Sequence, residues 1–291
     1  MNSKIITCKI VLFSIILVIT GNTNAQSYAL INPGGKSEYF ENMKKRAEIG
    51  LRTRTDWNFM IYDGNVTAQK YKERLLKYDK SGKLTEIENY SPEGKIRSIV
   101  IMKYEMDGLP FEETTYKPEG PVTGRVNYRY SHDRLLNEYT SYDANRLINF
   151  KWVAIRDTVS GEIVWMKYIT PDSISQKYKY TYSGVLSGLL VDESLYIADT
   201  LNSDRKIYWS NNPVRRDQEI ITDVKGKELF RRKYIYDHAG NNIRLETIFP
   251  DQSTVNKFIY AYDSNKLLTG FIDHDNNGNI ISYHTYTYEY Y

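Results

Sequence analysis

Apolar or aromatic residues alternate with polar residues, one position at a time, over most of this chain. In residues 125–130 the even positions hold valine and tyrosine, while the odd positions hold arginine and asparagine. Residues 177–182 and 257–262 also place aromatic side chains at every even position. A period of two with tyrosine and β-branched residues enriched predicts β-strands, whereas a helix needs apolar residues three and four positions apart. The pattern therefore predicts an all-β chain.

The strands are separated by turns that recur at fixed intervals. Tyrosines at positions 78, 90, 104, 116, 130 and 142 each lead into a turn, at alternating spacings of 12 and 14 residues. The resulting unit of 26 residues returns between Tyr182 and Tyr208, and again between Tyr236 and Tyr262. Such internal repetition indicates a repeated supersecondary unit. We predict a long antiparallel meander of tyrosine-rich hairpins, with two strands in each unit.

Two turn types alternate along this meander. In Asp79–Gly82 the aspartate can accept hydrogen bonds from nearby backbone N–H groups, and the glycine can take a positive φ. In Ser91–Gly94 and Lys117–Gly120 a proline stands at the second position, where its fixed φ suits the turn. We interpret Asp143–Asn145 as a turn one residue shorter, with the asparagine left-handed. The two types are predicted to mark opposite ends of the sheet.

The motif Tyr-Asp-x-x-Gly-Asn-(Leu/Ile) occurs in close variants at Tyr78–Leu84 and Tyr236–Asn241, and at His274–Ile280 with histidine replacing the tyrosine. It resembles the YD repeat of Rhs-type secreted proteins, and the resemblance covers most of residues 62–291. Large members of that family wrap the repeats into shells around toxins, and the repeats are often associated with carbohydrate binding. The resemblance implies a short secreted relative of single-sheet type, without a shell or a toxin domain.

Residues 1–25 have the features of a signal peptide. Lys4 and Lys9 precede an apolar run at 10–19, and small residues at 23–25 suit cleavage before Gln26. The run is too short for a bilayer, which needs about 20 apolar residues. We expect an exported protein, periplasmic, cell-surface or extracellular, with no transmembrane helix after signal removal. The only cysteine, at position 8, leaves with the signal, so neither a disulfide nor a thiol nucleophile is expected.

The rest of the chain divides into a cap segment, 26–52, and a β-hairpin repeat domain, 53–291. Ser37 could cap a helix over 38–49 that ends at Gly50, and we expect this helix to cover the exposed first edge of the sheet. The repeat domain should hold roughly 16 to 18 strands, too many for a flat sheet. We expect a coiled sheet, a two-layer sandwich or a partly closed barrel, most buried around the apolar strands that flank 157–161.

The strongest metal-like motif is Asp273–Gly278, which matches the first six positions of a calcium-binding loop. The twelfth position, which should supply a bidentate acid, is His284. We interpret the segment as another repeat turn and assign no metal site. The histidines are scattered, which does not suggest zinc ligation; they are His132, His238, His274 and His284.

No other motif points to catalysis or to a cofactor. Gly184–Gly188 is not a nucleophile elbow, since the central residue is leucine, and no P-loop or dinucleotide fingerprint occurs. After signal removal 37 basic residues face 36 acidic ones, which gives no electrostatic reason to expect a nucleic-acid partner. We therefore assign no catalytic residue and no cofactor, and interpret the charged strand faces as solvated.

These observations favour a secreted, non-enzymatic binding or scaffold module of the cell envelope. Its partner would be a polysaccharide such as peptidoglycan, stacked on exposed tyrosines, or a protein docked on an open sheet edge. Tyrosines exposed in one groove would favour the glycan, and a bare terminal edge would favour the protein.

Two alternatives stay open. An outer-membrane-associated β protein would suit the aromatic end of the last strand, 280–291, although short turns on both sides and the lack of an apolar band disfavour it. A glycan-active enzyme would require two carboxylates, or a histidine and a carboxylate, in one cleft.

Overall fold

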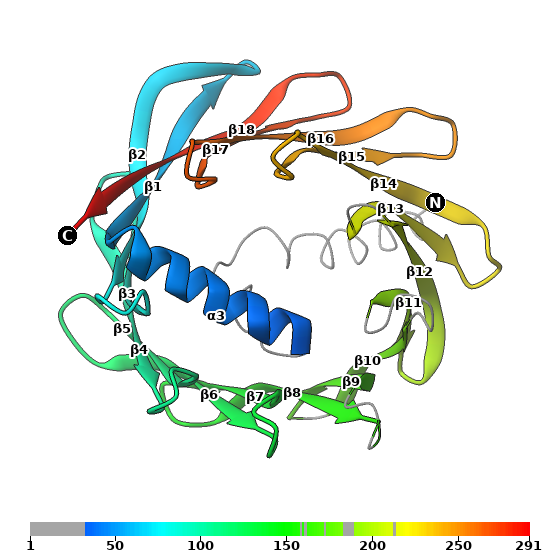
Figure 1. Ribbon diagram of the computed structural model, residues 1–291, viewed down its shortest axis with the longest axis horizontal. Coiled ribbons are helices and arrows are strands. Elements are labelled where there is room, and N and C mark those ends of the chain that lie inside the picture. Colours follow the sequence, from blue (N-terminus) through cyan, green and yellow to red (C-terminus); the bar gives the residue numbers. More distant parts are fainter. Residues whose placement is uncertain (1–32, 158, 160–161, 172, 183–188, 212–213) are drawn as a thin grey trace.

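Eighteen antiparallel strands form one closed barrel (Figure 1). The computed structural model describes residues 33–291 except 158, 160–161, 172, 183–188 and 212–213, so the predicted signal peptide lies outside the described residues. The strands are β1 (Leu51–Tyr62), β2 (Asn65–Tyr78), β3 (Leu84–Tyr90), β4 (Ile96–Tyr104), β5 (Pro110–Tyr116), β6 (Val122–Tyr130), β7 (Leu136–Asp143), β8 (Ile148–Arg156), β9 (Ile163–Thr170), β10 (Ser173–Tyr182), β11 (Leu190–Ile197), β12 (Thr200–Asn211), β13 (Val214–Asp223), β14 (Glu228–Tyr236), β15 (Asn242–Ile248), β16 (Thr254–Tyr262), β17 (Leu268–His274) and β18 (Ile280–Tyr290).

Closure is made between the first and last strands. Each strand pairs with its neighbours in the sequence, and β1 pairs with β18 from Leu51 opposite Tyr290 to Asn58 opposite His284. The all-β meander and the predicted strand number are confirmed, and the sheet closes completely. The expectation that a helix covers the exposed edge of the first strand was wrong, because β1 has a partner on both sides.

The predicted helix exists, as α3 (Pro33–Glu48) (Figure 1). Its side chains donate hydrogen bonds to backbone carbonyls in the turns after β2, β4 and β6. It starts before Ser37, which lies inside the helix and does not cap it; proline is tolerated in a first turn because its missing N–H would have no helical partner there. Within the described part of the chain, no helix is long and apolar enough to cross a bilayer.

The two predicted turn types share one backbone geometry. In both, the first N–H donates to the fifth carbonyl and the fourth N–H to the first, as at Asp79–Lys83 and Ser91–Lys95. At 143–147 the fourth residue, Arg146, has φ 67°. The turn is therefore not shortened, and the left-handed residue is Arg146, which corrects our interpretation of Asn145. Aspartate-led turns occur at both ends of the barrel, so turn type does not mark the end.

An inward tyrosine at the end of many even-numbered strands explains the 26-residue repeat. Its hydroxyl donates to the carbonyl of the residue 20 positions earlier, at the start of the neighbouring strand. The distances are 2.6 Å from Tyr130 to Pro110, 3.0 Å from Tyr262 to Asn242 and 2.6 Å from Tyr288 to Leu268. Each ring therefore fixes the register of its own hairpin, and a buried hydroxyl obtains the partner it needs.

Among the described residues, one of two buried hydrophobic clusters lies under α3 and includes residues of β6 to β9. Tyr39 of α3 is only 4% exposed and joins a cluster with Leu136, Trp152 and Ile163. The prediction of a buried region around 157–161 holds for one face only, since Ile155 is 38% exposed on the outer wall. Alternation in a barrel sends every second side chain outward, whatever its hydropathy.

Candidate functional site in the barrel lumen

The tyrosine-rich face of the sheet is the inner wall of the barrel. Tyr39 and Phe40 of α3 pack against this face, and α3 lies within the outline of the ring (Figure 1). Small barrels fill their interior with their own side chains, but a barrel of 16–18 strands encloses a channel that they cannot fill. The inner wall of the barrel is therefore the first candidate for a binding surface.

An aromatic strip crosses four adjacent strands of the inner wall, and we define it as Tyr128, Tyr139, Phe150 and Tyr168. Ring centroids lie 5.3 Å apart between Tyr128 and Tyr139, 5.8 Å between Tyr139 and Phe150, and 5.1 Å between Phe150 and Tyr168. Tyr128 is buried, and the other three are half-buried. Strands are about 4.8 Å apart, so the strip extends about 15 Å around the wall.

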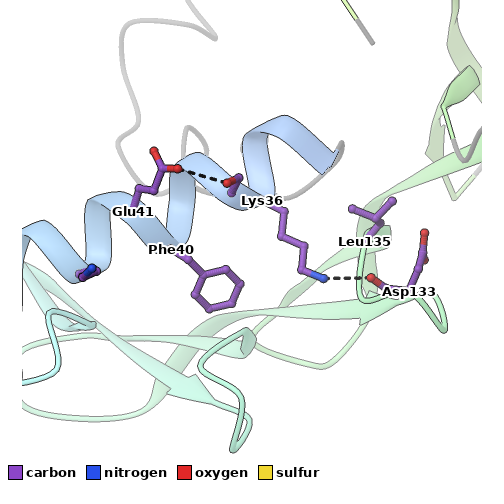
Figure 2. Close-up of a pocket in the computed structure, with 7 residues that line it drawn as sticks. Lys36, Phe40, Glu41, Asp133 and Leu135 are labelled. Atoms are coloured by element: carbon purple, nitrogen blue, oxygen red, sulfur yellow. Dashed lines mark hydrogen bonds between the residues drawn. The ribbon is translucent and has the colours of Figure 1, made fainter. Parts of the chain in front are cut away.

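A groove lies between α3 and the turn after β6 (Figure 2). Its volume is about 620 Å³, and Phe40 and Leu135 supply apolar side chains. Lys36 Nζ donates to the Asp133 carbonyl at 2.9 Å and ties the helix to the turn. Phe40 packs on the buried cluster that contains Tyr128, and Tyr139 and Tyr168 of the strip pack on the same cluster.

Buried ion pairs make up other parts of the inner wall. Glu219 is 0% exposed, with Arg216 Nη1 at 2.9 Å, Arg232 Nη1 at 3.3 Å and the Tyr234 hydroxyl at 3.0 Å. Desolvation raises the pKa of this carboxyl, but the guanidinium groups of Arg205, Arg216 and Arg232 outweigh it, so its pKa lies below its ordinary value. These charges are internally compensated and hold β12, β13 and β14 together.

A second ion cluster lies where the barrel closes. Asp56 is fully buried and receives Arg54 Nε at 2.8 Å and Arg74 Nη2 at 2.9 Å, from its own strand and from β2. Arg54 also stacks over the Tyr286 ring at 5.1 Å from the centroid. Because β1, β2 and β18 all contribute, the cluster stabilises the closing seam.

Glu113 of β5 is the buried acid that differs from these two. It is 7% exposed and accepts a hydrogen bond from the Tyr128 hydroxyl at the edge of the aromatic strip. Burial raises the pKa of this carboxyl to about 7. The carboxyl therefore changes protonation near neutral pH, next to the aromatic strip.

Replacing Glu113 with glutamine should flatten the dependence of stability on pH. Well below pH 4.5 the wild-type carboxyl is neutral in both the folded and the unfolded state. Between about pH 4.5 and 7 it ionises in the unfolded state but stays neutral in the folded state. The free energy of unfolding should therefore fall by about 3 kcal/mol as the pH rises through this window. The Glu113→Gln variant should lack that loss and be more stable at pH 8. Urea unfolding at pH 4.5, 6 and 8 measures this, and an unchanged slope would contradict the buried-acid assignment.

The segment predicted to resemble a calcium loop forms a turn. Asp275 Oδ1 accepts from the N–H groups of Asn277 and Asn279 at 2.9 and 2.8 Å, and Asp273 belongs to β17. Among the described residues there is no group of three or more acidic, histidine or cysteine side chains that could hold a metal ion.

His132 and His238 lie in turns, whereas His284 lies on β18 and contacts an acid that the sequence did not suggest. Its Nδ1 is 3.3 Å from Glu73 Oε2, and its ring stacks on Phe271 at 4.6 Å between centroids. The hydrogen bond from His284 lowers the pKa of Glu73. This pair can be found only when the pairing of β1 with β2 and β18 is known, because Glu73 and His284 lie at opposite ends of the repeat domain in the sequence.

The outer wall carries exposed cations on well-separated strands, alongside exposed apolar side chains such as Ile155 and Ile259. Lys179, Lys206 and Lys233 lie in the middle part of their strands, whereas Lys103 and Arg129 are next to the last residue of theirs. A lysine or arginine facing lipid at the bilayer midplane costs about 2–4 kcal/mol. Lys179, Lys206 and Lys233 would each carry this cost if the wall faced lipid.

No protein-family model matches the sequence, and no curated protein matches it. Among solved structures, the chain is similar to a porin-like protein from Bacteroides uniformis at 12% identity and a TM-score of 0.41, covering 83% of this chain and 97% of that chain. A porin-like protein from Bacteroides vulgatus gives 13% identity and a TM-score of 0.35, covering 82% and 98%. The Photorhabdus luminescens Tc holotoxin pore gives 11% identity and a TM-score of 0.23, covering 79% of this chain and 18% of that chain.

These likenesses are compatible with a β-repeat fold, and they do not show that the chain belongs to the Rhs-type family. With TM-scores below 0.5, they carry no argument about activity or ligand. The side chains of the inner and outer walls are therefore the basis for the functional proposal.

Proposed function

We propose that this protein is an exported, non-enzymatic β-barrel associated with the cell envelope, and that it binds an extended glycan along the aromatic strip. The observation that supports this proposal is the alignment of half-buried rings on the inner wall. Aromatic faces offer apolar area at low conformational cost, and tyrosine hydroxyls add hydrogen bonds. Because the strip is about 15 Å long, it suits a chain of several sugar units better than a single ring.

Docking of a protein on an open edge has less support. The terminal strands pair with each other. The first part of β2, residues 65–73, extends past β3, but it carries two register shifts against β1 and the exposed Lys70. Bulges and lysines are features that discourage edge-to-edge pairing. Tyrosines gathered on one concave wall, the pattern expected for a glycan, fit better.

The second candidate function is an outer-membrane-associated β protein whose barrel is inserted in the bilayer. Complete closure of the sheet favours it, since a spanning barrel must have no free edge. The exposed mid-strand cations oppose insertion. A peripheral protein should leave envelope membranes on washing with alkaline carbonate and stay monodisperse without detergent, whereas retention by the membrane would favour insertion.

Co-sedimentation of residues 26–291 with insoluble envelope polysaccharides, including peptidoglycan, tests the glycan proposal. We expect saturable binding that soluble fragments compete away, and at least tenfold weaker binding in Phe150→Ala and Tyr168→Ala. Tyr208→Ala is the matched control, because Tyr208 is an exposed ring on the outer wall. Urea unfolding of each variant separates lost binding from lost folding.

The proposal fails if the wild-type protein sediments no more than a tyrosine-rich unrelated protein. It also fails if Tyr208→Ala weakens binding as much as the strip variants do. Crosslinking to a protein in intact cells would then be the next measurement.

A further inference from the structure

Charged side chains that face each other across neighbouring strands of the barrel have opposite signs almost throughout. On one face of a sheet, directly opposite residues have Cβ atoms about 5 Å apart, so like charges there are destabilising. The opposite-sign pairs on the outer wall are Lys77–Glu86, Lys103–Glu112, Arg129–Glu138, Asp192–Lys206, Lys233–Glu246 and Glu246–Lys257.

Lys167 of β9 and Lys177 of β10 break this rule, because they stand directly opposite each other. Lys177 makes an ion pair with Asp199 from the β11–β12 turn. Within the described side chains, no carboxylate lies within ion-pair distance of Lys167. Asp199 therefore compensates Lys177 but not Lys167, and a local conflict left at Lys167 indicates a site kept for a ligand.

Two aromatic rings lie on the same outer face. Trp165 stands opposite Lys179, and Tyr196 stands opposite Lys177. The rings of Trp165 and Tyr196 meet over β10, with centroids 5.5 Å apart and planes inclined at 51°. An indole and a phenol therefore lie between three lysines, of which Lys179 is exposed.

We propose that this patch, Trp165, Lys167, Lys177, Lys179 and Tyr196, is a second binding site, separate from the lumen, for an acidic polysaccharide. A carboxylate or sulfate group placed between Lys167 and Lys177 would relieve their repulsion, and the paired rings would receive the apolar face of a sugar. Nucleic acid is disfavoured because the mature chain is close to neutral, so no broad positive field surrounds the patch.

Titration calorimetry with polygalacturonic acid at 50 and 300 mM NaCl tests this site, with uncharged dextran as the reference. In Lys167→Glu an opposite-sign pair replaces the repulsion, so we expect at least tenfold weaker binding together with a higher thermal unfolding midpoint. The control Lys103→Glu makes the same charge change but breaks a favourable pair with Glu112; it should unfold earlier and bind normally. Phe150→Ala should also bind normally, which separates this site from the lumen.

The proposal is overturned if Lys167→Glu binds like the wild type or unfolds at a lower temperature. It is equally overturned if dextran binds as tightly as polygalacturonic acid, or if duplex DNA does so at both salt concentrations. Weaker binding at 300 mM salt that disappears in Lys167→Glu supports it, because screening acts on exposed charges.

Discussion

Replacing Gly82 with alanine is expected to detach α3 from the barrel. A Cβ on Gly82 would lie 2.0 Å from the Met43 carbonyl oxygen, and a helix backbone cannot rotate away as a side chain could. The same turn accepts a 2.8 Å hydrogen bond from Arg46 Nε to the Gly82 carbonyl, which would be lost with the helix. Exposure of Tyr39 and its neighbours should lower the free energy of unfolding by about 2–3 kcal/mol beyond the strain of the turn itself.

Gly226→Ala provides the matched control for that experiment. Gly226 has φ +76° against +80° for Gly82, but nothing lies within 4 Å of the position of its Cβ. Both variants suffer the left-handed strain of about 1–2 kcal/mol, and only Gly82→Ala disturbs the helix. Urea unfolding gives the difference, and limited proteolysis after Lys44, Lys45 or Arg46 should accelerate in Gly82→Ala alone. Equal losses and equal proteolysis would show that α3 does not depend on this contact.

Replacing Glu219 with glutamine should destabilise the barrel by about 3–5 kcal/mol, because the half-buried arginines around this buried carboxylate would lose their counter-charge. Glu219 is wholly buried, and it contacts residues of β13 and β14 as well as lying near Arg205 of β12. The wild-type pKa is lowered from 4.5, so this stability is present above about pH 4.5 and is lost as the pH falls through the folded-state pKa. The variant should lack that acid-induced loss.

The control for this substitution is Glu246→Gln. Glu246 also stands opposite two cations, Lys233 and Lys257, and pairs with Arg244 Nε at 3.3 Å, but it lies on the outer wall and is 20% exposed, whereas Glu219 is wholly buried. Ion pairs that water reaches contribute about 0–1 kcal/mol, so the control should lose less than Glu219→Gln. Urea unfolding at pH 7 compares the two variants. Similar losses of unfolding free energy would show that the buried cluster around Glu219 contributes no more to stability than the ion pairs of the outer wall.

Local features of the chain could be predicted from the sequence because they depend on neighbouring residues. Alternation fixed the strands, and the spacing of Tyr78, Tyr104 and Tyr130 fixed the hairpins, since each unit carries its own turn residues. The aromatic strip follows from the same alternation once the inner face is known. The left-handed residue at Arg146 was missed because asparagine is the better intrinsic choice, whereas the hydrogen bonds of the turn select its fourth position.

Features that need the whole ring could not be predicted in this way. Closure of β1 on β18 depends on the summed tilt and stagger of every strand, which no local pattern encodes. The contact between His284 and Glu73 appears only after closure. By contrast, the Lys167–Lys177 pair could have been found, because β9 and β10 follow each other in the chain, which limits the residues that can stand opposite each other. Glu219 could also have been found from the sequence, because it lies two positions from the inward-facing Ile221 on the same strand.

The tyrosine-to-carbonyl hydrogen bond spans 20 residues within one unit, so each pair of strands holds its register without help from distant units. Gene duplication of a 26-residue segment can therefore widen such a barrel. Every duplication adds two strands, one inward ring and one carbonyl acceptor together, and leaves the remaining contacts intact. The circumference of the barrel thereby becomes an evolvable quantity that changes in discrete steps.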